Sequence, residues 1–247
     1  MKQSEKISNW IKSYALDNSI KSLVIGVSGG IDSAVVSTLC AHTGLPTHCV
    51  LLPIKQNPEH TLRGKNHINL LKSKYNNVFL HEVDLTEVFD KFSQTFESMK
   101  TDLGMANSRS RLRMVSLYQI ASYTNGIVVG TGNKVEDFGV GFFTKYGDGG
   151  VDISPIADFL KTEVYEIAKE IGVNQEIINA LPTDGLWEDD RNDESQIGAS
   201  YPELEWAMQF VNDRELTKRE EQILTIYNKL HHQNKHKMVE IPIYKKI

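Results

Sequence analysis

Glycines and hydroxyl residues between positions 28 and 33 have the types and spacing of a phosphate-binding loop. The segment SGGIDS (residues 28–33) follows a short apolar run at 23–27 and precedes a helix-like apolar run. A glycine turn between a strand and a helix directs backbone N–H groups and the helix N-terminus toward an anion. Ser28, Ser33 and the loop amides are therefore candidates for holding phosphates, and Asp32 for binding Mg²⁺ on them.

The glycine spacing does not fit a dinucleotide-binding fingerprint. That fingerprint needs G-x-G-x-x-G and an acidic residue at the end of the second strand, which holds a ribose hydroxyl. Here the glycines are Gly26, Gly29 and Gly30, and the second apolar run ends in Leu-Leu-Pro at residues 51–53. Both requirements fail, so this segment is not predicted to hold a dinucleotide.

The same segment also lacks the residue that defines a Walker loop. The Walker pattern needs a lysine after its last glycine, and no lysine occurs between Lys21 and Lys55. The remaining readings are a loop for the pyrophosphate part of ATP, or a glycine turn that only lets a helix pack closely on a strand.

Strand-like and helix-like segments alternate along the first two thirds of the chain. Strands are expected at 23–27, 49–52, 77–83 and 126–130, and helices at 4–17, 32–40, 57–75, 84–99, 109–123, 161–171 and over the last forty residues. This alternation predicts an α/β fold, a doubly wound and mostly parallel sheet flanked by helices. Two long polar segments, 139–155 and 181–198, are expected to be functional loops in a single domain spanning 1–247.

Composition limits the partners and the location. The net charge of −5 argues against a broad nucleic-acid surface, and no apolar run is long enough to cross a membrane or act as a signal peptide. Two cysteines, Cys40 and Cys49, form no disulfide framework. We therefore expect a cytoplasmic protein that binds neither nucleic acid nor membrane.

Five downstream motifs occur in a characteristic order. They are NSRSRLRM (107–114), VVGTGNKVE (128–136), GFFTKYGDGGVDISPI (141–156), LKTEVYEIA (160–168) and LPTDGLW (181–187). With SGGIDS, they resemble the ammonia-dependent NAD⁺ synthetase family of N-type ATP pyrophosphatases over residues 8–237. The resemblance implies Mg²⁺- and ATP-dependent amidation of deamido-NAD⁺ with ammonia, through an adenylated intermediate, giving NAD⁺, AMP and pyrophosphate. It also implies a homodimer and the last step of NAD⁺ biosynthesis.

The resemblance also assigns the ATP and metal residues. ATP contacts are implied for Gly26, Val27, Ser28, Gly29, Gly30, Ile31, Asp32, Ser33, Thr131, Lys161 and Thr183. Asp32 and Glu136 would bind Mg²⁺, and Lys161 would neutralise charge on the transferring phosphates. Thr131 also has a simpler reading as a helix N-cap, and both roles can hold.

A second set of residues is implied for the nicotinate dinucleotide. The set is Arg111, Lys145, Asp152, His236 and Lys237, and Asp148 would hold ammonia and accept its proton. Each has an alternative reading: a turn aspartate for Asp148, and solvated cations for the lysines, the arginine and the basic tail. The neighbouring Arg109 and Arg113 receive no role.

Three further expectations concern the whole molecule. The 27 residues before Ser28 leave no room for the amidase domain of glutamine-dependent relatives, so free ammonia is the expected nitrogen donor, unless a separate amidase subunit supplies it. Residues 185–194 carry acidic side chains where many relatives have Gly-Gln-Thr, which leaves the contacts of this loop open. The apolar stripe of Met114, Leu117, Ile120 and Ala121 serves either the dimer contact or the core.

Two rival functions are an RNA-modifying adenylating enzyme and a non-catalytic nucleotide sensor. The first would need a basic surface, which this sequence does not offer. The second would not need the Mg²⁺ carboxylates, yet both Asp32 and Glu136 are present.

Overall fold

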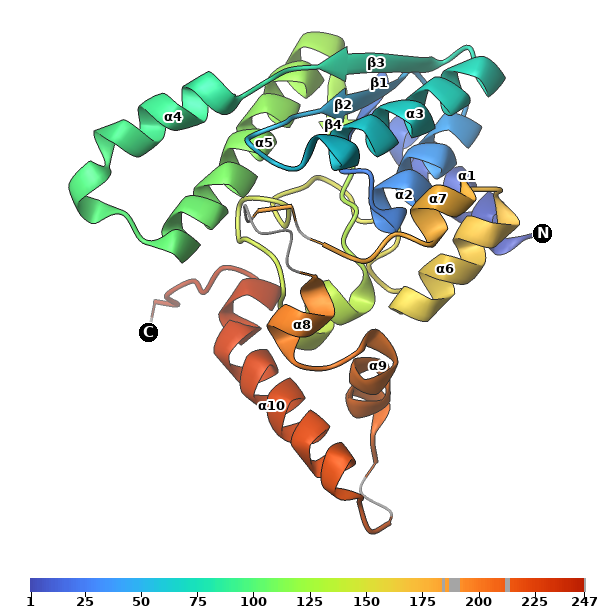
Figure 1. The fold of residues 1–247 in the computed structure, drawn as a ribbon. Helices are drawn as coiled ribbons and strands as arrows, with labels where there is room; N and C mark the ends of the chain where they lie inside the picture. The colour runs from blue at the N-terminus through green and yellow to red at the C-terminus, as the bar shows by residue number, and fades with distance from the viewer. Residues whose placement is uncertain (184, 187–191, 212–213, 247) are drawn as a thin grey trace.

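A sheet of parallel strands forms the centre of the molecule in the computed structural model, which describes residues 1–183, 185–186, 192–211 and 214–246. The strands are β1 (Ser22–Gly26), β2 (Thr47–Leu51), β3 (Val78–Glu82) and β4 (Gly126–Val128). Within the described residues their order is β3-β2-β1-β4, and every pairing is parallel (Figure 1). The prediction of a parallel α/β sheet is confirmed.

Helices connect and cover these strands. They are α1 (Gln3–Asp17), α2 (Ile31–His42), α3 (Pro58–Lys74), α4 (Thr86–Thr95), the 3₁₀ turn η1 (Glu97–Met99), α5 (Asp102–Thr124), the π-helical turn η2 (Val135–Val140), α6 (Lys161–Glu170), α7 (Gln175–Ile178), α8 (Asp193–Ile197), α9 (Tyr201–Gln209) and α10 (Lys218–Met238). Within the described ranges, none of these helices combines the length and apolar character that crossing a bilayer requires.

The two faces of the sheet carry different helices because side chains alternate along each strand. Leu23, Ile25 and Ile127 point to one face and join the core formed with α1, α2 and α6. Val24 and Val128 point to the other face, where α5 covers them together with the start of α4. Helices therefore cover both faces, as the doubly wound prediction requires.

The strand order creates a crevice at one end of the sheet. The chain runs outward from β1 to β2 and β3, and then returns to place β4 on the other side of β1. At such a reversal the connections after the two central strands leave in opposite directions, and ligands bind beyond the carboxyl ends of those strands. The loops after Gly26 and Val128 border this crevice.

A smaller apolar cluster lies away from the sheet. It joins η2 to α8, α9 and α10, the elements at the lower end of Figure 1. Val135 and Val140 of η2 pack there with Leu204 and Ile223, which are almost fully buried. The turn that carries Glu136 is thus held between the sheet and the C-terminal helices.

Several predicted boundaries shift for local reasons. The helix expected at 84–99 divides into α4 and η1, while α5 starts seven residues earlier than expected because the Thr101 side chain accepts a hydrogen bond from Gly104 N and caps it. Asn57 caps α3 as predicted, with its side chain accepting from Glu59 N at 3.0 Å. Beyond Val128, the expected strand continues only as a bridge between Val129 and Ile153.

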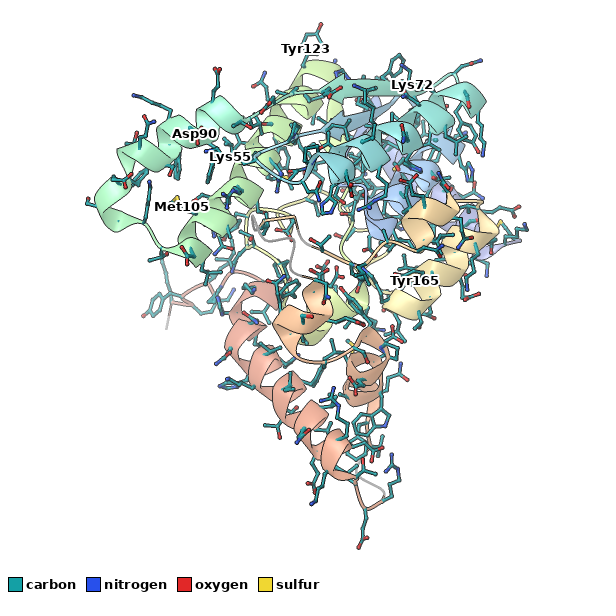
Figure 2. All side chains as sticks on the ribbon, in the orientation of Figure 1. Lys55, Lys72, Asp90, Met105, Tyr123 and Tyr165 are labelled. Carbon is teal, nitrogen blue, oxygen red and sulfur yellow. The ribbon has the colours of Figure 1, made fainter. Side chains whose placement is uncertain are left out.

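Helix α4 stands apart from the main body. It projects to the side of the sheet in Figure 1, and its contact with the loop after β2 includes an ion pair between Lys55 and Asp90 (Figure 2). Phe89 is its only buried residue, although the helix is strongly amphipathic. Most of its apolar side is therefore presented outward.

A buried histidine lies between α2 and α3. His67 is 2% exposed, and its Nε2 lies 2.9 Å from the Ser37 hydroxyl. Burial disfavours the charged imidazolium and lowers the pKa of His67 to about 4. The folded protein therefore holds this side chain neutral at pH values where an unfolded histidine would already be protonated.

We expect this histidine to make stability fall with acidification. Its folded pKa is below the unfolded value, so its contribution is complete above about pH 6.5 and is lost as pH falls toward 4. Between pH 7.5 and 5.0 the loss from His67 alone should be about 2 kcal/mol. Urea unfolding of the wild type and of His67→Gln at both pH values measures it, because the difference between the two proteins removes the other histidines. Equal pH dependence in both proteins would contradict the assignment.

Candidate active site

The loop predicted to hold phosphates is closed by its own hydroxyl groups. Ser28 N donates to Ser33 Oγ at 3.2 Å, Gly30 N donates to Ser28 Oγ at 3.2 Å, and Ser33 Oγ donates to Gly30 O at 3.0 Å. Helix α2 begins directly afterwards at Ile31, with Gly30 in an extended conformation as its N-cap. The predicted arrangement of strand, turn and helix N-terminus is present.

Helix α3 supports this loop from the side. Gly29 has φ +88°, and a Cβ atom there would lie 2.4 Å from the His60 carbonyl oxygen. Arg63 Nε donates to the Gly29 carbonyl at 2.8 Å. Only glycine tolerates both the left-handed conformation and the close approach, so Gly29 has a structural role that sequence alone did not separate from phosphate binding.

A cavity of about 260 Å³ opens beyond the carboxyl ends of β1 and β4. Twelve of the predicted ATP, metal and catalytic residues line it: Gly26, Val27, Ser28, Gly30, Ile31, Asp32, Ser33, Thr131, Glu136, Asp148, Lys161 and Thr183. Gly29 is the one member of the predicted ATP set that does not line the cavity. Segments more than 150 residues apart in the chain therefore converge on one hollow, at the place where the sheet topology puts ligands.

One lysine joins the two predicted metal ligands. Lys161 Nζ lies 2.5 Å from Asp32 Oδ2 and 3.0 Å from Glu136 Oε1. The lysine side chain is 3% exposed, and the two carboxylate side chains are 17% and 16% exposed. These three charges come from the N-terminal ends of α2, η2 and α6, so their contact fixes three separate segments of the chain around the cavity.

The electrostatics keep this lysine charged. Burial alone would lower the pKa of Lys161, but the negative charges of Asp32 and Glu136 outweigh it and raise that pKa. Burial also works against ionisation of Glu136, yet Lys161 and a hydrogen bond from Tyr201 lower its pKa. The centre therefore holds a permanent positive charge beside an ionised carboxylate.

Neighbouring polar groups orient the two carboxylates. Tyr201 Oη donates to Glu136 Oε1 at 2.6 Å, and Asn133 Nδ2 donates to Asp32 Oδ1 at 3.3 Å. Asn133 also accepts from the backbone N–H groups of Val135 and Glu136. Asn133 thus supplies the cap that sequence reasoning considered for Thr131, which leaves the Thr131 hydroxyl available to the cavity.

The residues present fit a Mg²⁺ ion held jointly with phosphates. Carboxylate oxygens are the ligands that Mg²⁺ prefers, usually one or two from the protein with the rest from phosphates and water. A single cationic atom, Lys161 Nζ, already reaches both Asp32 and Glu136. Across the described part of the chain no group of three or more His, Cys, Asp or Glu side chains is arranged to hold a metal ion, so these two carboxylates would need a bound phosphate to complete the coordination.

Asp148 also lines this cavity and is held in place by hydrogen bonds. Its Oδ1 accepts from Ser110 Oγ at 2.6 Å and from Thr144 N at 3.0 Å, while its own N–H donates to Ser110 Oγ at 2.9 Å. Burial raises the pKa of Asp148, and these hydrogen bonds oppose that rise. Asp148 is therefore both a turn aspartate, which was the alternative interpretation, and a residue of the cavity wall.

The residues predicted for the nicotinate dinucleotide gather outside this cavity. Arg111 Nε donates to Lys145 O at 3.2 Å, Lys145 Nζ donates to His236 O at 2.9 Å, and Lys237 Nζ donates to Phe143 O at 2.7 Å. The basic end of α10 is thus attached to the glycine-rich loop rather than free in solvent.

A wide hollow of about 610 Å³ lies beside this group. It is lined by Met114, Val115, Tyr118, Gln119, Ser122, Tyr146 and Gly150. Asp152 contacts one of these lining residues: its Oδ1 accepts from Tyr118 Oη at 3.0 Å, and its Oδ2 accepts from Val128 N at 2.7 Å. Met114 lines both hollows, and the turn at 147–150 contributes Asp148 to one and Gly150 to the other.

Sequence reasoning left two arginines of α5 without a role, and both contact the segment after Thr183. Arg109 Nη1 donates to Leu186 O at 2.9 Å, and Arg113 Nη2 donates to Gly185 O at 3.4 Å. Being four residues apart, they share one face of the helix, whereas Arg111 lies on another. The spacing of the three arginines predicts that Arg111 lies on a different face from the other two, but it does not predict which segment each face contacts.

Two other expectations concerned the apolar stripe of α5 and the acidic loop at 185–194. Met114, Leu117 and Ala121 are buried against the sheet, with Ile120 packed on the same cluster, so the apolar stripe of α5 belongs to the core. The acidic loop expected around 185–194 falls largely on residues 187–191, which lie outside the described residues. Nothing in the sequence marked Tyr201 and Asn133 as residues that orient the two carboxylates, although Asn133 lies within the motif VVGTGNKVE.

The arrangement can hold a polyphosphate, balance its charge with a buried cation and present a carboxylate a short distance away. Comparison with known proteins agrees with this chemistry. The sequence model of NAD synthase matches residues 3–246. The NH(3)-dependent NAD(+) synthetase of Finegoldia magna is 38% identical over 83% of this chain and 82% of its own. That of Alkaliphilus metalliredigens is 35% identical over 97% of this chain and 96% of its own.

Solved structures give the same grouping. The NMN synthetase of Francisella tularensis has a TM-score of 0.88 and 30% identity, covering 99% of this chain and 97% of its own. The NH3-dependent NAD synthetase of Campylobacter jejuni has a TM-score of 0.79 at 24% identity, a likeness that concerns the fold. From the match of nearly its whole length, the chain belongs to the NAD synthase family.

Proposed function

We propose that this chain catalyses the ATP-dependent amidation of deamido-NAD⁺ with ammonia, giving NAD⁺, AMP and pyrophosphate in the last step of NAD⁺ biosynthesis. The observation that carries the proposal is the ion-paired group of Asp32, Lys161 and Glu136 beside the SGGIDS loop. Family membership and the names of the relatives supply the reaction. The described residues contain all the proposed site residues, and we propose that 1–247 acts as one catalytic unit.

The first step activates the substrate carboxylate. A carboxylate is a poor electrophile because oxide is a poor leaving group. Its oxygen attacks the α-phosphorus of ATP, a new P–O bond forms, and the bond to pyrophosphate breaks. We assign the pyrophosphate part of ATP to Ser28, Ser33 and the amides of the intervening loop, with Thr131 and Thr183 as further hydroxyl contacts. Lys161 stabilises the negative charge that grows on the departing pyrophosphate.

The second step forms the amide. Ammonia attacks the carbonyl carbon of the mixed anhydride, the C–N bond forms, and the C–O bond to AMP breaks. One proton leaves the nitrogen. We assign Asp148 to hold the nucleophile and accept that proton, because Ser110 Oγ and Thr144 N fix its carboxylate in the cavity wall.

We propose that Mg²⁺ accompanies ATP, with Asp32 and Glu136 as its protein ligands. The ion, when bound, supplies Lewis-acid stabilisation of the phosphates. Asn133 and Tyr201 hold the two carboxylates in place through their hydrogen bonds. Lys161 pairs with the same two carboxylates in the structure. When the carboxylates hold the ion instead, the charge of Lys161 becomes available to the phosphates.

We assign the dinucleotide substrate to the wide hollow on the far side of the 147–150 turn. Arg111, Lys145 and Lys237 provide positive charge for its two phosphates, His236 a ring nitrogen, and Asp152 a carboxylate beside Tyr118 of the hollow. The turn separates this hollow from the ATP cavity, and Met114 lines both. In this proposal the nicotinate end of the substrate reaches past the turn to Asp148, while the rest of the dinucleotide stays in the wide hollow.

A mononucleotide is the second candidate substrate. The structural relative of Francisella tularensis is an NMN synthetase, and the corresponding acid is nicotinic acid mononucleotide. It carries the same carboxylate as deamido-NAD⁺ but lacks the adenylate half. The reaction at the ATP cavity is identical in the two cases, so the choice depends on the outer hollow.

A homodimer is the assembly that we propose. Exposed apolar side chains follow one another along α4, η1 and the start of α5: Val88, Phe92, Phe96, Met99 and Leu103. The rings of Phe92 and Phe96 contact each other at a tilt, with their centroids 4.8 Å apart. A second copy would cover this face, since monomers seldom expose such patches.

We place the protein in the cytoplasm on the evidence of its two buried free thiols, and assign it no nucleic-acid or membrane partner.

Product analysis tests the reaction. The purified chain is incubated with ATP, Mg²⁺ and either deamido-NAD⁺ or nicotinic acid mononucleotide, with ammonium and glutamine offered separately. We expect NAD⁺, AMP and pyrophosphate from deamido-NAD⁺ with ammonium, and little product with glutamine. ADP and phosphate would rule out adenylation. A higher kcat/KM for the mononucleotide would reassign the substrate without changing the site.

The metal role has its own test. Asp32→Asn keeps the shape of the side chain but removes its charge, and we expect kcat to fall by a factor on the order of 100 while thermal unfolding changes little. Mn²⁺ binding in the presence of ATP, followed by electron paramagnetic resonance, should weaken in parallel. Asp158→Asn is the matched control, because Asp158 is exposed and pairs with Lys134 at the surface. Unchanged Mn²⁺ affinity in Asp32→Asn would remove Asp32 from the metal site.

A further inference from the structure

Three serines on α5 use their hydroxyl groups in two different ways. Ser108 Oγ donates to Gly104 O at 2.8 Å and Ser116 Oγ donates to Leu112 O at 3.0 Å. Both bonds stay inside the helix, in the i to i−4 pattern usual for helical serines. Ser110 Oγ instead leaves the helix and donates to Asp148 Oδ1 at 2.6 Å, 38 residues away in the chain.

The bond between Ser110 and Asp148 is reciprocal. Asp148 N returns a hydrogen bond to Ser110 Oγ at 2.9 Å, so the hydroxyl is donor to the side chain and acceptor from the backbone of one residue. Two bonds to the same residue fix both the position of the turn and the rotation of the carboxylate. Ser110 is 5% exposed and lines the ATP cavity, so solvent does not replace these bonds easily.

The turn is shaped around this hydroxyl. A Cβ atom on Gly147 would lie 2.2 Å from Ser110 Oγ, which is an impossible contact. A glycine at 147 is therefore needed for the turn to approach α5 closely enough for the two bonds. Asn107, one helical turn earlier, secures the other end of the loop by accepting from Thr144 Oγ1 at 2.7 Å.

The two carboxylate oxygens of Asp148 are consequently inequivalent. Oδ1 accepts from both Ser110 Oγ and Thr144 N. Within the portion of the chain that the structure describes, no hydrogen bond reaches Oδ2. The carboxylate belongs to the cavity wall, so Oδ2 is the oxygen that can receive a donor entering the cavity.

We infer that Ser110 is a positioning residue for the amidation step: it saturates one oxygen of Asp148 and directs the other toward the incoming ammonia. This inference rests on the proposed function, in which Asp148 holds the nucleophile. Ser110 acts on the reaction through Asp148, the residue to which both of its described side-chain hydrogen bonds run. Its removal should therefore affect the second half of the reaction and spare the first.

The two half-reactions can be measured separately. Adenylation is followed as exchange of labelled pyrophosphate into ATP with deamido-NAD⁺ and without ammonium. Amidation is followed as NAD⁺ formed over a range of ammonium concentrations at fixed pH. Ser110→Ala should raise the KM for ammonium about tenfold, the effect of losing one hydrogen bond at a charged group, while the exchange rate stays close to that of the wild type.

Two further variants make the test specific. Ser116→Ala removes a hydroxyl from the same helix that bonds only within the helix, and should leave both half-reactions unchanged. Ser110→Cys keeps a side chain of similar size with a weaker donor, and should give an intermediate KM even if Ser110→Ala folds poorly. Thermal unfolding of all variants checks that each is native under assay conditions.

The outcomes separate this inference from the function on which it rests. A wild-type chain without exchange and without NAD⁺ formation would overturn the proposed function and the inference with it. An active wild type, with Ser110→Ala equal to Ser116→Ala in its KM for ammonium, would overturn the inference alone. A parallel fall in exchange and amidation would show that Ser110 supports the whole cavity and would also overturn it.

Discussion

The contact of Lys161 with Asp32 and Glu136 is the interaction on which the site depends. It joins the helix after β1, the turn after β4 and the first residue of α6 through one buried ammonium group. A lysine at a helix N-terminus is electrostatically unfavourable because the helix dipole is positive there, and burial adds a further penalty. The two carboxylates offset both costs. Removing the lysine would leave two buried carboxylates without a countercharge, so the three residues form one electrostatic unit.

This unit has a location because of the sheet topology. The reversal of strand order between β1 and β4 opens a crevice that needs walls from both halves of the chain. Helix α5 supplies one wall and acts toward both hollows: Ser110 holds the turn at Asp148, while Tyr118 holds Asp152. The glycine-rich turn can separate two ligands because a single helix fixes it on each side. Under the proposed assignment of the two ligands, the carboxylate of the substrate would react at this turn.

The fold could be predicted from the sequence wherever a local pattern decides the structure. Alternating apolar runs specified the parallel sheet, and Asn57 and Pro58 specified the start of α3. Boundaries failed where a single side chain decides them, as at Thr101, which starts α5 early. The members of the site were largely predictable from motifs, and Asp32, Glu136 and Lys161 do meet. Their partners were not, because Tyr201 and Ser110 act across 65 and 38 residues of chain, respectively, and carry no local signature.

The difference between these two groups of residues has a physical origin. A loop that grips phosphate works through its own backbone, so its glycines must stand next to one another in the sequence and form a readable motif. A residue that orients another acts through a tertiary contact, and any hydroxyl or amide that the fold brings near will serve. Ser108, Ser110 and Ser116 are indistinguishable as letters, yet only Ser110 faces the turn, because the helix rotates by about 100° per residue and Gly147 leaves room for its hydroxyl. Specific positioning in this site is therefore a property of helix phase and turn shape, which only the three-dimensional structure provides.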